Sequence, residues 1–107
     1  QLFHSAQALA MQPRPRSNRL AIVTNAGGPG VLATDALIKS GGQLAELSDK
    51  TMEKLNALLP SNWSHNNPVD VLDTASPEVF RQAIDACLRD ENVDGILTIF
   101  TPQATTN

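Results

Sequence analysis

The sequence predicts an α/β fold in which a parallel sheet lies between two layers of helices. Two apolar runs, Arg19–Thr24 and Val93–Phe100, have the length and aliphatic content of strands that are buried on both faces. Segments with helical spacing of apolar residues lie between these runs, so strand and helix alternate along the chain. Because such alternation requires right-handed crossover connections, it favours a three-layer α/β/α arrangement.

The first 18 residues are expected to form a helix and a proline-rich linker that belong to a preceding domain. Apolar residues recur at helical spacing from Leu2 to Ala10, which predicts a short amphipathic helix. Pro13 and Pro15 forbid a helix in the next segment and favour extended chain. We therefore place a boundary after residue 18 and assign residues 19–107 to the α/β unit. Both ends of the sequence have the appearance of cuts rather than natural termini.

Glycine and proline mark the ends of the first helix that follows the strand at residues 19–24. The helix is expected to start at Pro29, whose fixed φ and missing N–H suit the first helical position, and the pair at 41–42 is typical of a helix end. The apolar side chains of this helix predict its buried face, and they are Val31, Leu32, Ala36, Leu37 and Ile38.

The remaining elements follow from capping residues and apolar periodicity. Residues 43–47 predict a second short strand, and Ser48 is placed to cap a helix that Pro60 ends. Residues 69–72 predict a brief strand, and Ser76 begins a helix whose buried stripe includes Phe80, Ile84, Cys87 and Leu88. We expect the runs at 43–47, 19–24 and 93–100 to pair in that order across one parallel sheet.

Composition excludes several classes of protein. The formal charge is −3 and aromatic residues make up 4% of the chain, which argues against a nucleic-acid partner. The apolar runs are far shorter than the ~20 residues of a membrane span, so no membrane partner is expected. The single cysteine cannot form an internal disulfide, and a cytoplasmic location is therefore the default expectation.

The segment from Asn25 to Val31 is the main candidate site, because a glycine turn leads there from a buried strand into a helix. Its candidate anion-binding residues are Asn25, Ala26, Gly27, Gly28, Pro29, Gly30 and Val31. Backbone N–H groups and the helix dipole would face an anion that approaches closely where Cβ atoms are missing. The alternative is a tight turn that needs glycine only for its conformation, and the turn alone does not separate the two.

Two other phosphate-binding motifs are alternative interpretations of this turn. A P-loop needs lysine and a hydroxyl residue after its glycines, whereas Val31 and Leu32 follow Gly30 here. A dinucleotide fingerprint fits the spacing of Gly28, Gly30 and Ala33 and would use an acid such as Glu46, but extra residues separate it from the strand.

Two further loops fall at the carboxyl edge of the same predicted sheet, where ligands bind in open α/β folds. The supporting residues in these loops are Asn67, Pro68, Asp70, Thr101, Pro102 and Gln103. Asp70 and Asp73 suggest a metal pair, but hydrogen bonding of Asp70 to loop backbone is favoured, and no metal site is predicted. His65 is expected to be a surface residue and Cys87 a small core residue, and no catalytic residue is predicted in this chain.

Four ordered motifs resemble the nucleoside-diphosphate-forming acyl-CoA synthetases, and in particular their succinyl-CoA-ligase-like flavodoxin domain. The motifs are AIVTNAGGPGVLATDAL (21–37), LAELS (44–48), NPVDVL (67–72) and IFTPQA (99–104). The resemblance implies a flavodoxin-like fold, here truncated, whose glycine turn holds the phosphoryl group of a phosphohistidine. That histidine lies in another domain of the family, in a motif that this chain lacks.

The resemblance also implies the wider setting of the chain. The parent would make acyl-CoA from an acid, CoA and ATP with Mg²⁺, using CoA-binding, phosphohistidine and ATP-grasp domains as partners. The chain alone would be inactive and would hold at most phosphate or sulfate. An alternative is a non-catalytic, ligand-sensing region, because some bacterial lysine acetyltransferases carry a similar segment. Cutting the domain after the last strand would leave an open apolar edge, so a homo-oligomer is expected.

Overall fold

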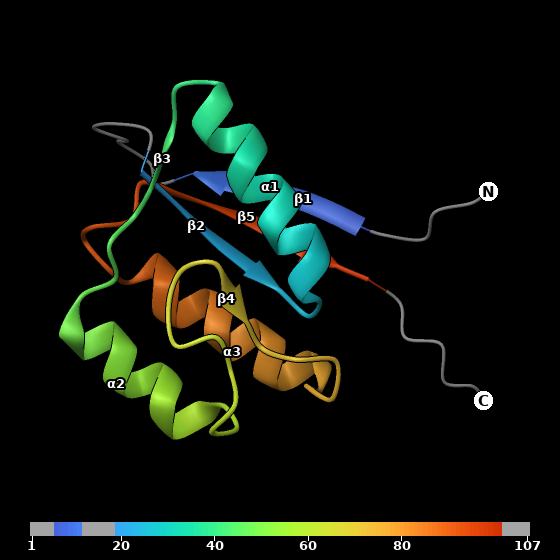
Figure 1. Ribbon diagram of the computed structural model, residues 1–107. Coiled ribbons are helices and arrows are strands. Elements are labelled where there is room, and N and C mark those ends of the chain that lie inside the picture. Colours follow the sequence, from blue (N-terminus) through green and yellow to red (C-terminus); the bar gives the residue numbers. More distant parts are fainter. Residues whose placement is uncertain (1–5, 12–18, 102–107) are drawn as a thin grey trace.

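The computed structural model describes residues 6–11 and 19–101, which form one sheet covered by helices on both faces (Figure 1). The elements in chain order are β1 (Ala6–Met11), β2 (Arg19–Thr24), α1 (Gly27–Lys39), β3 (Gln43–Leu44), α2 (Asp49–Leu58), β4 (Val69–Asp70), α3 (Pro77–Leu88) and β5 (Gly95–Phe100). The alternation of strand and helix after residue 18 confirms the predicted α/β class.

The sheet has the order β1-β5-β2-β3, and β4 pairs with the carboxyl-terminal half of β2. β2 is the central strand and runs parallel to β3, β4 and β5. This arrangement confirms the predicted order, in which the strand at 19–24 separates the strands near 43 and 95. The carboxyl ends of β2, β4 and β5 therefore meet at one edge of the sheet.

The helix predicted from Leu2 to Ala10 is wrong where the structure describes it. Ala6–Met11 is a strand that pairs antiparallel with all of β5, from Ala6 opposite Phe100 to Met11 opposite Gly95. A short apolar segment can form either a helix or a strand. Here backbone pairing with β5 favours the strand. The linker at 12–18 lies outside the described residues, and the boundary after residue 18 remains a prediction.

The pairing of β1 with β5 also removes the basis of one expectation. We expected the far edge of β5 to be open and to join copies of the chain, but β1 occupies that edge along its whole length. A strand edge that is already paired leaves no row of free backbone N–H and C=O groups for another chain to pair with. The argument for a homo-oligomer through this edge is therefore wrong for the intact chain.

The main core lies between the sheet and the pair α2 and α3, whereas α1 covers the opposite face (Figure 1). Ala21, Val23 and Ile96 face this core, together with Trp63, whose side chain is 2% exposed. The indole Nε1 of Trp63 donates a hydrogen bond to Asn56 Oδ1 at 2.9 Å, so its one polar atom is satisfied despite burial.

The buried face predicted for α1 is wrong. Val31, Leu32 and Ile38 are 66%, 72% and 58% exposed, whereas Gly30 is the buried residue of this helix. A Cβ atom on Gly30 would lie 3.0 Å from Thr24 Cγ2, so the helix approaches the sheet through its smallest residue. Val31, Leu32 and Ile38 consequently point away from the sheet, whereas Leu37 is half-buried.

Candidate functional site

The candidate site lies at the carboxyl end of the central strand, where β2 turns into α1. β4 pairs with β2 so that Asp70 lies opposite Thr24, and the end of β5 brings Thr101 to the same place. The structure thus brings together three loops that the sequence places far apart, including the predicted residues Asn25, Asp70 and Thr101. Pro102 and Gln103 lie outside the described residues.

The side chain of Asn25 links the carboxyl ends of β2 and β5. Its Nδ2 donates to the carbonyl oxygen of Thr101 at 2.8 Å, and its Oδ1 accepts from the N–H and the Oγ1 of Thr101 at 2.8 and 3.0 Å. The side chain of Asn25 is buried, and these hydrogen bonds engage both ends of its amide. In this structure Asn25 therefore holds the turn in place, which makes it a positioning residue for anything that binds at α1.

The backbone of the turn is fixed by the preceding threonine. Thr24 Oγ1 accepts a hydrogen bond from the N–H of Ala26 and donates one to the carbonyl oxygen of the same residue, both at 3.0 Å. Ala26 is the N-cap residue of α1 and has extended backbone angles. The sequence analysis did not single out Thr24, although a hydroxyl residue just before a glycine turn is a recognisable signal for such local bonding.

The N-terminus of α1 differs from those of the other described helices. Ser48 caps α2 by accepting from the N–H of Thr51, and Ser76 caps α3 by accepting from the N–H of Val79. Both of those helices also carry an acid in the first turn. In α1 no side chain caps the helix and the first turn holds no acid, so α1 itself supplies no group that compensates the positive end of its dipole.

The glycines of the turn have different surroundings. A Cβ on Gly28 would meet nothing within 4 Å, whereas a Cβ on Gly30 would press against Thr24 and lie 3.7 Å from Pro68 Cβ. Gly27 and Gly28 are exposed at the start of the helix. Gly30 is instead buried, and its N–H bonds to the carbonyl oxygen of Ala26 at 3.4 Å. Gly30 therefore allows the close packing of α1 against β2, whereas Gly27 and Gly28 lie where a side chain would meet less.

The side chain of Asn67 joins β2 to the residue that follows β3. Its Oδ1 accepts from the N–H of Ile22, and its Nδ2 donates to the carbonyl oxygens of Leu20 and Ala45, all at 2.9 Å. The side chain is buried. These bonds give Asn67 a structural role within the described residues.

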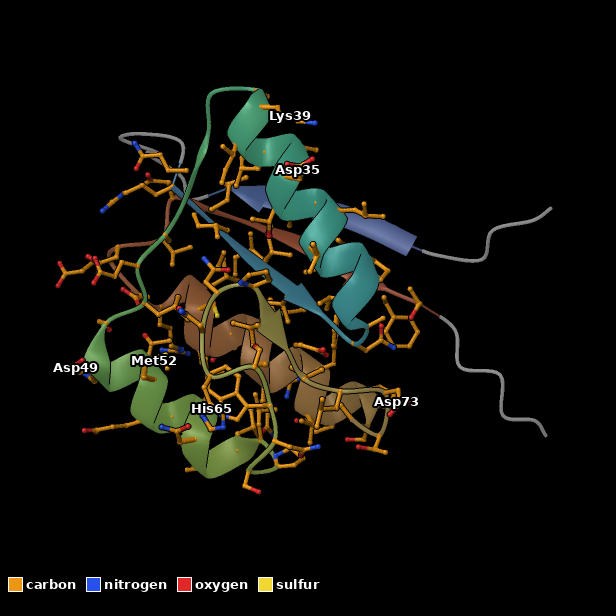
Figure 2. All side chains as sticks on the ribbon, viewed as in Figure 1. Asp35, Lys39, Asp49, Met52, His65 and Asp73 are labelled. Atoms are coloured by element: carbon orange, nitrogen blue, oxygen red, sulfur yellow. The ribbon has the colours of Figure 1, made fainter. Side chains whose placement is uncertain are left out.

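His65 and Cys87 lie as the sequence analysis predicts. His65 is exposed, its ring lies 4.8 Å from that of Trp63 between centroids, and its Nε2 lies 2.6 Å from the carbonyl oxygen of Ser61 (Figure 2). Cys87 is buried in α3, and burial raises the pKa of its thiol to about 12. A thiol of that kind is a poor nucleophile at neutral pH.

A groove of about 350 Å³ lies between α2 and α3, at the amino end of β5 and far along the sheet from the glycine turn. Its lining residues are Ser48, Lys50, Thr51, Lys54, Ala86, Arg89, Asp90 and Glu91. Burial raises the pKa of Asp90, but hydrogen bonds from Ser48 and Asn92 outweigh it and hold the pKa below its ordinary value. That carboxylate is therefore engaged with protein donors, and the groove has mixed charge.

The part of the chain at residues 6–11 and 19–101 contains no cluster of three or more His, Cys, Asp and Glu side chains able to hold a metal ion. None of its helices has the length and apolar character needed to cross a bilayer.

A comparison with protein families matches residues 20–105 to the ligase-CoA domain. ADP-forming acetate–CoA ligase I of Archaeoglobus fulgidus is 44% identical over 97 residues, which are 91% of this chain and 14% of that protein. The α subunit of ADP-forming acetate–CoA ligase II of Pyrococcus furiosus is 46% identical over 88 residues, which are 82% of this chain and 19% of the subunit. The chain thus spans less than a fifth of these relatives.

Two solved structures are also similar to this chain. A protein of Pyrococcus horikoshii OT3 superposes with a TM-score of 0.73 at 48% identity, covering 78% of this chain and 19% of that one. Dinucleotide forming acetyl-coenzyme A synthetase 1 of Candidatus Korarchaeum cryptofilum, in complex with phosphate and ADP, superposes with a TM-score of 0.69 at 28% identity. That match covers 78% of this chain and 18% of the synthetase.

Proposed function

The chain belongs to the ligase-CoA domain family, and on that premise we propose that it is the phosphate-binding segment of an ADP-forming acyl-CoA synthetase. The parent enzyme would convert an acid, CoA and ATP into acyl-CoA, ADP and phosphate. The relatives named above are ligases of this type, which favours a synthetase over the ligand-sensing region of a lysine acetyltransferase.

The uncapped N-terminus of α1 carries the proposal. Gly27 and Gly28 are exposed in the first turn of α1, where the N–H groups of a helix point along its axis to where an anion would sit. A helix terminus of this kind contributes about 0.3–1 kcal/mol to holding a negative charge, and up to ~2 kcal/mol where the site is partly buried. Such a contribution suits a group that must be released again after transfer.

The other residues of the edge would keep this terminus in position. Asn25 ties the turn to the end of β5, Thr24 fixes the backbone of Ala26, and Gly30 lets α1 lie close against β2. None of these three contacts requires a ligand, so the anion site is preorganised. The histidine that would carry the phosphoryl group, the nucleotide and its Mg²⁺, and CoA would all be held by other domains of the parent.

An amide-shift titration of this chain with inorganic phosphate tests the anion site. The N–H signals of Gly27 and Gly28 should shift, whereas those of Thr51 and Val79, at the capped starts of α2 and α3, should stay unchanged. If the capped helices respond as strongly as α1, the binding is unspecific and the proposal fails.

A substitution at the N-cap sharpens this test. Ala26→Asp would place a carboxylate where the anion sits, because the extended backbone of Ala26 suits a capping side chain. We expect phosphate binding to weaken at least tenfold, while the free energy of unfolding rises by about 1 kcal/mol. Ala26→Ser caps without adding a full charge and serves as the control, with a smaller loss of binding.

The proposed activity is tested in the parent protein that carries this segment. With acetate, CoA and ATP it should release ADP, and Ala26→Asp should slow that release. An acetyltransferase would instead use acetyl-CoA and lysine without consuming ATP. The 107-residue chain alone should form no acyl-CoA and retain no label from radioactive ATP. Label that disappears on His65→Ala would show that His65 had been dismissed wrongly.

A further inference from the structure

The side of α1 that faces away from the sheet carries large apolar residues. Val31, Leu32 and Ile38 are each more than half exposed, and at ~3.6 residues per turn they fall within about a third of the helix circumference. Grouping of this kind is typical of a buried helix face, which is why the sequence predicts burial for these residues. Within residues 6–11 and 19–101, however, nothing covers them enough to bury them.

The other described helices have the ordinary arrangement. α2 and α3 turn apolar residues toward the core, and the exposed side of α3 carries the ion pairs Arg81–Glu78 and Arg89–Asp85. α1 is reversed, because its close approach to the sheet is made by Gly30 and its large apolar side chains lie outside. Since clustered apolar residues on a surface mark sites of protein contact, this side of α1 has the character of an interface.

The charged residues on this side of α1 are already paired. Asp35 and Lys39 form an ion pair four residues apart, with 3.2 Å between Asp35 Oδ2 and Lys39 Nζ, and both side chains are exposed (Figure 2). A partner therefore has no unpaired charge to match between the apolar residues. We call Val31, Leu32, Ile38 and this ion pair the α1 outer face, and its chemistry suits a partner with an apolar surface.

We propose that the α1 outer face is an interdomain interface, covered in the parent protein by an apolar surface of another domain of the same polypeptide. The matched segment makes up 14% and 19% of the two relatives named above, so more than four-fifths of each lies outside it. A tethered domain meets the face at an effective concentration on the order of millimolar, which a second copy at micromolar concentration does not reach. The inference goes beyond the proposed function and does not depend on it.

The test measures how fast iodoacetamide alkylates a cysteine on this face, in the 107-residue chain and in the parent protein. The probes are Leu32→Cys and Ile38→Cys, and Ala57→Cys, at an exposed position of α2, is the matched control. Cys87 is buried and its thiol has a raised pKa, so it contributes little background. Mass spectrometry of the peptides assigns the label to each position.

In the 107-residue chain, all three probes should react at similar rates, because all three positions are exposed. In the parent protein, Leu32→Cys and Ile38→Cys should react about tenfold more slowly or less, since labelling then requires the interface to open. Ala57→Cys should change less. Leu32→Glu added to Ile38→Cys should return its labelling to the rate of the 107-residue chain, because it buries a charge in the interface, whereas Ala57→Glu should leave the protection in place.

Unchanged labelling of positions 32 and 38 in the parent, or equal slowing at position 57, would overturn the inference. Protection that survives Leu32→Glu would show that apolar docking is not its cause and would overturn it too. Slow labelling of the 107-residue chain that becomes slower as its concentration rises would assign the face to a second copy instead. None of these measurements involves phosphate, so their failure would leave the proposed anion site standing, and a failed phosphate titration would leave this interface standing.

Discussion

Asn25 and Thr101 form three hydrogen bonds across the carboxyl edge of the sheet, at 2.8, 2.8 and 3.0 Å. They join the end of the central strand β2 to the end of β5 directly beside the start of α1. Residues 76 positions apart are thereby held in one turn. The geometry of the candidate anion site depends on this pair, because Ala26 and Gly27 follow Asn25 immediately.

Asn25→Ala should lower the free energy of unfolding by about 2 kcal/mol, because it removes the three hydrogen bonds that the buried Asn25 side chain forms with Thr101. Urea unfolding measures the change, and Asn62→Ala, at an exposed position, provides the control. The variant should also bind phosphate less tightly, since its turn is no longer held. An unfolding curve that matches the wild type would show that the pair contributes little.

The sequence was sufficient to predict the central part of the fold. The strands at 19–24 and 95–100 are apolar on both faces, and the helices of 49–58 and 77–88 begin at serines that do cap them. These signals are local, so they can be read from the sequence without the tertiary structure. The position of the glycine turn at the carboxyl edge follows from strand order alone.

The remaining features depend on contacts that no local pattern contains. Ala6–Met11 is a strand because β5 offers it an edge, and α1 turns Val31 and Leu32 outward because Gly30 fits against Thr24. The bonds of Asn67 and the approach of Asp70 to Gly27 likewise arise from chain segments that meet only after folding. No local pattern indicated which atoms these side chains contact.

The glycines of the turn should tolerate alanine unequally. Gly30→Ala should lower the free energy of unfolding by about 1–3 kcal/mol, because its Cβ would press on Thr24 and force α1 away from the sheet. Gly28→Ala meets open space and should be neutral or stabilising by roughly 0.5 kcal/mol, since alanine favours the helix. Thermal or urea unfolding of the two variants compares them directly. Equal effects would mean that helix propensity, rather than the close approach, governs both positions.

Cys87 should make the chain less stable at high pH. Burial raises the pKa of its thiol from 9.0 to about 12, so the folded state holds the proton more strongly than the unfolded state. The resulting contribution to stability is complete below pH 9 and is lost as the pH rises towards 12. Urea unfolding at pH 8, 9.5 and 11 should show a steeper alkaline decline for the wild type than for Cys87→Ala. An equal alkaline decline in the free energy of unfolding of the two proteins would show that the thiol does not cause the decline.

Removal of residues 1–11 should convert the chain into a self-associating species. In the intact chain β1 pairs with β5 from Gly95 to Phe100, and the truncation would free the backbone N–H and C=O groups along that edge. The strand GILTIF contains no proline or charged residue that could block pairing with another copy. Light scattering over a range of micromolar concentrations should therefore show a larger mass for the truncated chain than for the intact one. A synthetic peptide of residues 1–12, added in excess, should reverse the association by occupying the same edge. Association that the peptide leaves unchanged would place the contact elsewhere, and a truncated chain that stays monomeric would show that an open β5 edge is tolerated.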